Sequence, residues 1–214
     1  WDTEHPNLYR CIAELLDAEG QVLHSRETTF GFRTAVFRAD GFYLNGKKTF
    51  LRGLNRHQSY PYIGYAAPES LQRQDARILK NELHCNAVRT SHYPQSQYFL
   101  DECDRLGLLV FTELPGWQHI GDGAWKDRAC AMLREMLLQN RNHPSIILWG
   151  VRINESVDDD EFYTRTNQIA HALDPSRATS GVRYLEKSHL LEDVYAYNDF
   201  SHNLSLIHIS EPTR

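Results

Sequence analysis

Two glutamates, Glu113 and Glu155, stand directly after apolar segments of the chain. The longer segment, residues 145–153, is β-branched and almost uncharged, which is typical of a strand buried on both faces of a parallel sheet. In α/β barrels the loops after such strands build the active site, so a glutamate there is placed to act as a general acid. A solvated charge at a strand end is equally compatible with this segment alone.

Glycoside hydrolysis requires a pair of carboxyl groups. One protonates the leaving oxygen, and the other attacks the sugar or activates a water molecule. Glu113 and Glu155 could form this pair. Alternatively, only one is catalytic and the other holds Arg89 or a histidine in place.

Polar side chains follow the other expected strands in the same way. A barrel that needed only stability would not place polar groups so regularly, so the repetition favours an enzyme. His57 and His92 stand out because each follows a strand and lies beside an arginine or an aromatic residue. The complete set of strand-end residues is Asn55, Arg56, His57, Arg89, Ser91, His92, Glu113, Asn154, Glu155, Tyr197, Asn198 and Asp199.

Apolar strands alternate with amphipathic helices from about residue 51 onward. Repeated βα units predict a parallel sheet, and the absence of G-x-G-x-x-G after the first strand disfavours a dinucleotide-binding fold. The predicted fold is therefore α/β, a (β/α)8 TIM barrel that is incomplete, because only about six of its eight strands are found. Expected strands lie at 50–55, 86–90, 108–112, 146–153, 178–182 and 193–197, and expected helices at 69–83, 95–106, 125–141 and 161–173.

The first 40 residues predict antiparallel strands instead. Residues 9–15 and 21–28 alternate in character around the turn residues 17–20, which predicts a hairpin at the end of a β-sandwich. A second hairpin is expected at 41–50, with Asn45-Gly46 as its turn.

Several function classes are disfavoured by composition and motifs. A formal charge of -5 without a basic cluster argues against nucleic acid, and no apolar stretch has the roughly 20 residues that span a bilayer. The sequence contains no H-E-x-x-H zinc motif, no G-x-S-x-G elbow and no strand-end lysine for a lyase or aldolase. The cysteines are widely spaced, which predicts reduced core residues and favours a cytoplasmic location; they are Cys11, Cys85, Cys103 and Cys130.

Two longer motifs carry a family resemblance. Residues 86–94, followed by Asp104-Arg105-Leu106-Gly107-Leu108, closely resemble a signature of the family-2 glycoside hydrolases, which include β-galactosidases and β-glucuronidases. Residues 142–150, running into Asn154-Glu155, resemble the second signature of this family. Further matches are Phe30-Gly31-Phe32-Arg33, Leu44-Asn45-Gly46 and residues 51–57.

The resemblance implies a domain division and residue roles. Residues 1–40 would be the C-terminal part of an immunoglobulin-like β-sandwich domain, and residues 41–203 a partial barrel. Glu155 would be the acid/base on the fourth strand, and Asn154 would bind the hydroxyl next to the anomeric carbon. The other expected site residues are Arg89, which would help to hold the nucleophile, His57 and His92, which would contact sugar or carboxylates, Glu113 as a supporting carboxylate, and Trp117 and Tyr197 near the substrate.

The family's nucleophile is a glutamate on the seventh strand, and the resemblance implies that this chain stops before it. Asp199 comes too early, and Glu211 follows the sixth strand without the crossover that a parallel connection needs. Residues 204–214 resemble a translated sequencing adapter and are expected to be non-native. We therefore expect a C-terminally truncated fragment that is inactive alone, with open sheet edges that favour association.

The leading hypothesis is a retaining, exo-acting β-glycosidase, most simply a β-galactosidase, which acts on a carbohydrate substrate. The alternative is a non-catalytic carbohydrate-binding or scaffold fragment of a degenerate barrel. Some β-galactosidases of the family bind Mg²⁺ through Glu-x-His, which residues 112–117 do not match, so no cofactor is expected with certainty. A homo-oligomer is possible for the full-length protein. The apolar strand and Trp149 are expected to raise the pKa of Glu155.

Overall fold

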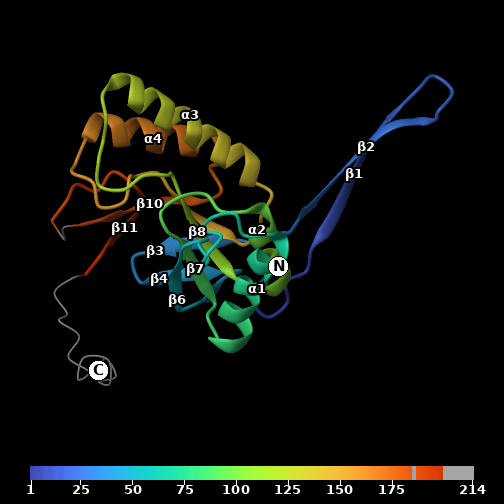
Figure 1. Cartoon of the computed structure of the whole chain (residues 1–214), viewed down its shortest axis with the longest axis horizontal. Helices are drawn as coiled ribbons and strands as arrows, with labels where there is room; N and C mark the ends of the chain where they lie inside the picture. The colour runs from blue at the N-terminus through green and yellow to red at the C-terminus, as the bar shows by residue number, and fades with distance from the viewer. Residues whose placement is uncertain (185–186, 200–214) are drawn as a thin grey trace.

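A six-stranded parallel sheet forms the centre of the computed structural model, which describes residues 1–184 and 187–199. Strands that follow one another in the chain are neighbours in the sheet, from β6 to β11, so the sheet curls in one direction as part of a barrel (Figure 1). The predicted TIM-barrel fold is confirmed, with six parallel strands in the described residues. They are β6 (Gly53–Arg56), β7 (Ala87–Thr90), β8 (Leu109–Glu113), β9 (Ile146–Gly150), β10 (Ala178–Arg183) and β11 (Val194–Tyr197).

In the residues that the structure describes, four α-helices pack on this sheet, each close to its predicted position. Aspartates begin two of them: the side chains of Asp122 and Asp159 accept a hydrogen bond from the backbone N–H three residues further on. Gly107 ends α2 with a left-handed φ of 69°, which glycine adopts without a steric penalty. The helices are α1 (Glu69–Arg77), continued by a π-helical turn (Ile78–Glu82), α2 (Gln97–Leu106), α3 (Gly123–Asn140) and α4 (Asp160–Leu173).

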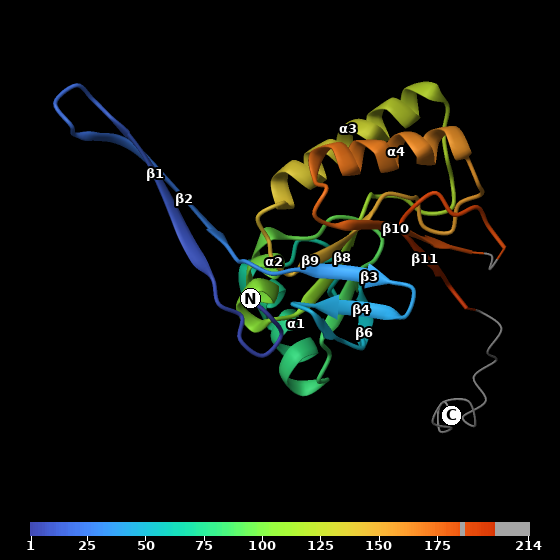
Figure 2. The same cartoon turned by 180° about the vertical axis from the view of Figure 1, so that it is seen from behind.

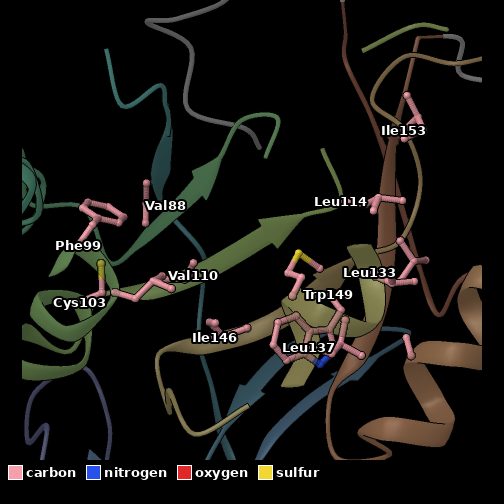
Figure 3. Close-up of a cluster of buried hydrophobic side chains, with 14 of the residues drawn as sticks. Val88, Phe99, Cys103, Val110, Leu114, Leu133, Leu137, Ile146, Trp149 and Ile153 are labelled. Atoms are coloured by element: carbon pink, nitrogen blue, oxygen red, sulfur yellow. The ribbon is translucent and has the colours of Figure 1, made fainter. Parts of the chain in front are cut away.

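The main hydrophobic core lies between the sheet and these helices (Figure 3). Val110 and Trp149 from the strands meet Phe99, Leu133 and Leu137 from the helices, and all five are almost fully buried. This packing fixes the strands, and with them the positions of the loops that follow their ends.

A small antiparallel sheet packs against the starts of the barrel strands. It consists of β3 (Ala35–Arg38), β4 (Gly41–Leu44) and β5 (Lys47–Lys48). Phe42 and Leu44 of this sheet join a second core with Leu109 and Ile147. The predicted hairpin is present as the antiparallel pair β4–β5 with its turn at Asn45-Gly46. Strand β3 was not predicted, because its four residues give too short an alternating pattern.

The hairpin of β1 (Tyr9–Leu16) and β2 (Val22–Phe30) extends away from the barrel (Figures 1 and 2). It confirms the predicted strands and turn. Leu15 and Leu23 remain 61% and 64% exposed, because no other part of the described chain packs on the hairpin along most of its length. Whether it belongs to a β-sandwich stays a prediction.

The four cysteines are free thiols, and three are buried as expected. Cys11 is exposed on the hairpin, so the prediction that all four are core residues was wrong at that position. Among the helices of the described ranges, none is both long and apolar enough to cross a membrane.

Candidate active site

Asn154 and Glu155 lie beyond the end of β9, on a bulged continuation of the strand. The strand was predicted to reach residue 153 but ends at Gly150. Val151 N donates to Ser180 O and Glu155 N donates to Val182 O, both at 2.8 Å. Between these two hydrogen bonds the chain advances by four residues after β9 but by only two residues in β10, so it bulges. The extra residues turn the chain at Glu155, whose φ of 56° is left-handed. Such backbone conformations of non-glycine residues cluster at functional sites.

Arg89 organises a buried network beside these residues. Its Nε donates to Glu113 Oε1 at 2.7 Å, and its Nη2 donates to Glu113 Oε2 at 3.1 Å and to Asn154 Oδ1 at 2.6 Å. Glu113 and Asn154 are each 2% exposed. Because Oδ1 of Asn154 accepts from Arg89, its Nδ2 is fixed as a donor, and this buried atom has no partner among the described residues.

Two histidines extend the network. Arg89 Nη2 approaches His92 Nδ1 at 3.1 Å, so Nδ1 acts as the acceptor and the proton of a neutral ring lies on Nε2. The ring of His57 meets His92 edge to face at 5.2 Å, and His57 Nδ1 lies 3.3 Å from the hydroxyl of Tyr93. Burial, with help from His92 and Arg89, lowers the pKa of His57, which favours its neutral form.

The carboxylate of Glu155 is held by three N–H donors. Oε2 accepts from Trp117 Nε1 at 2.9 Å and from Gln118 Nε2 at 3.2 Å, and Oε1 accepts from Asn198 Nδ2 at 2.6 Å. Trp117 pairs with Asn154 as a parallel bridge, and Gln118 N donates to Asn154 O at 2.7 Å. The loop after β8 therefore lies directly against the acid-bearing segment.

The pKa of Glu155 lies below its usual value, contrary to expectation. Burial raises it, but the hydrogen bonds from Trp117, Gln118 and Asn198 together lower it by more, because each stabilises the charged form. Trp149 cannot provide the apolar contact that was expected. It is fully buried in the core below the helices, where its Nε1 donates to Asp174 Oδ2 at 2.9 Å.

The structure brings together most of the predicted site residues and adds two. Arg89, His92, Glu113, Trp117, Asn154 and Glu155 are linked by the contacts above, with His57 at their edge. Tyr197 is 41% exposed and packs on Tyr195, with ring centroids 6.3 Å apart, while the next residue, Asn198, reaches Glu155. The sequence placed Asn198 at a strand end but gave it no role. Gln118 was not predicted, because its side chain is directed toward Glu155 by a left-handed backbone φ of 63°, which no local sequence pattern predicts.

Oxygen ligands for Mg²⁺ do not gather at Glu155 in the described part of the chain. The groups that face its carboxylate are nitrogen donors, whereas Mg²⁺ takes oxygen ligands. In the described residues, three side chains that could together bind a metal ion lie at the opposite end of the sheet: Asp101, Asp104 and His143. Asp104 and His143 already bind each other there, at 2.6 Å.

Carboxylates, an arginine and histidines at the C-terminal ends of barrel strands define the chain as a TIM-barrel protein with a strand-end site. The sequence profile of "Glycosyl hydrolases family 2, TIM barrel domain" matches residues 36–206, and that of "Glycosyl hydrolases family 2" matches residues 1–33. The chain belongs to glycosyl hydrolase family 2.

Similar proteins carry two different activity names. A β-galactosidase of Thermoanaerobacterium thermosulfurigenes is 61% identical over 203 residues, which are 95% of this chain and 28% of that protein. A β-galactosidase of Thermoanaerobacter pseudethanolicus is 58% identical over 205 residues, again 28% of its length. An FMN-binding β-glucuronidase from Facaelibacterium prausnitzii L2-6 superposes with a TM-score of 0.88 at 32% identity, over 94% of this chain and 33% of that one. The chain thus spans about a third or less of the length of these relatives.

Proposed function

We propose that the chain supplies the acid/base half of a retaining β-glycosidase, and that the complete enzyme is a β-galactosidase. The names of the two relatives at 61% and 58% identity support galactose as the sugar, and the 32% identity to the β-glucuronidase gives weaker support to glucuronic acid. The observation that carries the proposal is a Glu155 carboxyl group beside a buried Arg89–Glu113–Asn154 network.

Glu155 protonates the glycosidic oxygen in the first step, while a second carboxylate attacks the anomeric carbon to form a glycosyl-enzyme. In the second step Glu155 takes a proton from water, which attacks the same carbon and releases the sugar. Glu113 is unsuited to be the nucleophile, because it is 2% exposed and both of its oxygens bind Arg89. In this proposal the attacking carboxylate comes from another part of the complete enzyme, since this chain matches only 28% of each of the two β-galactosidases.

Asn154 and the histidines have binding roles in this proposal. The unpartnered Nδ2 of Asn154 is a donor for a sugar hydroxyl, since a buried N–H without a partner is costly unless a ligand accepts from it. His92 Nε2, kept protonated by the contact of Nδ1 with Arg89, offers a second donor. Trp117 is 60% exposed beside Glu155, so its ring can stack on a sugar face while its Nε1 binds the carboxylate.

A lowered pKa keeps Glu155 ionised at neutral pH in the arrangement seen here. The negative charge of the attacking carboxylate would oppose this in the complete site, because a like charge nearby favours the protonated form. Sugar bound at Oε2 or Oε1 would also displace N–H donors, which raises the pKa further.

The test is a chimera in which residues 1–203 replace the matching segment of the Thermoanaerobacterium thermosulfurigenes β-galactosidase. Glu155→Gln in this chimera should lower the hydrolysis of galactosides with poor leaving groups by about 10²- to 10⁴-fold. Activated aryl galactosides, whose leaving oxygen needs little protonation, should lose much less in the glycosylation step. Equal loss on both substrates would contradict the acid/base role, and sugar binding without any hydrolysis would favour a non-catalytic fragment.

A further inference from the structure

Asn198 reaches Glu155 from the last strand of the described sheet. β11 ends at Tyr197, and the backbone N–H of Asn198 donates to Arg183 O at 2.8 Å, which fixes Asn198 against β10. Its side-chain Nδ2 then donates to Glu155 Oε1 at 2.6 Å, among the short distances typical of a bond to a charged acceptor.

The other carboxylate oxygen is held from the opposite side by the loop after β8. Trp117 Nε1 and Gln118 Nε2 both donate to Oε2. The charged or titratable side chains that the described residues bring around this arrangement include His92 after β7, Arg89 and Glu113 behind Asn154, His119 next to Gln118, and Tyr197 and Asp199 on either side of Asn198. Of these, His92 favours the ionised form of Glu155. Within the described residues, the hydrogen bonds that hold the carboxylate of Glu155 therefore all come from N–H donors, on the loop after β8 and on Asn198 after β11.

Donors on both oxygens make protonation of Glu155 unfavourable until one of them moves. The indole of Trp117 can only donate, so it can never accept a proton from a carboxylic acid. An asparagine amide is different, because a turn of its side chain replaces the N–H donor with an acceptor oxygen. Among the described residues, Oε1 is bonded by Asn198 and Oε2 by both Trp117 and Gln118, so Oε1 is the oxygen that can gain a proton with the smaller loss of hydrogen bonds.

We propose that Asn198 is a positioning residue for Glu155, which holds Oε1 toward β11 and governs how readily this oxygen takes up the proton used in glycoside cleavage. The proposal rests on the proposed acid/base role of Glu155. Asn198 acts through Glu155 and needs no contact with the sugar.

The first test is the pH dependence of kcat/KM in the chimera. Asn198→Ala should move the descending limb, which reports the protonated acid of the free enzyme, to higher pH by about one pH unit, since a hydrogen bond to the charged form is lost. Trp117→Phe should move it in the same direction. Asn142→Ala is the matched control, because Asn142 lies exposed before β9, at the far end of the sheet. An unmoved limb in Asn198→Ala, or a higher KM with an unmoved limb, would overturn the proposal.

The second test needs no activity. In this chain labelled with carbon-13 at the glutamate carboxyl carbons, the Glu155 resonance is assigned by its absence in Glu155→Gln and titrated in Asn198→Ala and Asn142→Ala. We expect the midpoint to rise by about one pH unit in Asn198→Ala alone. Full activity of Glu155→Gln in the chimera would disprove the acid/base role. The titration would still show whether Asn198 stabilises the ionised form of Glu155, so the two failures can be told apart.

Discussion

The two ends of the parallel sheet both contain buried charge, but they use it differently. At the N-terminal end, charged side chains mainly bind backbone. Asp104 Oδ1 accepts from Ser145 N at 3.0 Å, and Arg177 donates to the carbonyl oxygens of Ile146 at 2.7 Å and His143 at 2.9 Å. At the C-terminal end, the contacts of Arg89 in the described structure go to side chains: Glu113, Asn154 and His92.

This difference separates stability from function within one fold. Charged groups that bind backbone fasten loops to strands and serve only the protein itself. Side chains that bind one another hold each other in one orientation and leave some of their atoms for a ligand, as Asn154 Nδ2 shows. Active sites of barrels lie at the C-terminal ends of the strands, and the opposite end serves stability.

Arg89→Met would break the C-terminal network with the largest effect. It leaves the Glu113 carboxylate buried without its guanidinium, which should lower the free energy of unfolding by about 3–5 kcal/mol, and hydrolysis by the chimera should also fall sharply. Urea unfolding and initial rates measure the two effects. Arg165→Met is the control, because the Arg165–Asp127 pair is exposed to solvent, which screens its charges, so its removal should leave the free energy of unfolding almost unchanged. Equal losses in both variants would contradict the assignment.

Asp104→Ala and Asp104→Asn test the other end. The alanine variant leaves Ser145 N and His143 without a buried acceptor, which should cost about 3 kcal/mol, whereas activity per folded molecule should stay unchanged. Asparagine should restore most of this. The amide oxygen of asparagine can still accept from Ser145 N, and the side chain fills the same space as that of aspartate. Lower kcat in a folded Asp104→Asn chimera would show that the two ends are not separate.

The barrel strands, the helices and the meeting of Arg89, Glu113 and Asn154 could be predicted from the sequence. Apolar periodicity reveals strands and helices, and parallel strands bring their ends together regardless of loop detail. The contacts of Gln118 and Asn198 with Glu155 could not be predicted, because they depend on left-handed backbone at Gln118 and Glu155. The direction of the Glu155 pKa was missed for the same reason: apolar neighbours can be counted along a strand, but donors from separate loops cannot.

Asp174→Asn should show a pH-dependent loss of stability at the N-terminal end. Burial raises the pKa of Asp174, but Arg177, Ser176 and Trp149 outweigh it and lower the pKa to about 2. Because this pKa is lowered in the folded state, the ionised Asp174 stabilises the fold at pH values above the usual pKa of 3.8. This stabilisation is lost as the pH falls through the folded pKa of about 2. Urea unfolding should therefore show a difference of about 2 kcal/mol between wild type and variant at pH 6, which disappears near pH 2. A difference that is constant with pH would contradict this.

Glu155→Gln should have the smallest effect on stability, although its pKa is also lowered. As for Asp174, the ionised side chain stabilises the fold at pH values above the usual pKa of 4.5. This stabilisation is lost as the pH falls through the lower pKa of the folded state. The side chain is only partly buried, so solvent screening should keep the contribution below about 1 kcal/mol. The same urea experiment from pH 6 to pH 3 measures it. A loss as large as that of Asp174→Asn would mean that Glu155 serves the fold, and that the C-terminal end is not reserved for chemistry.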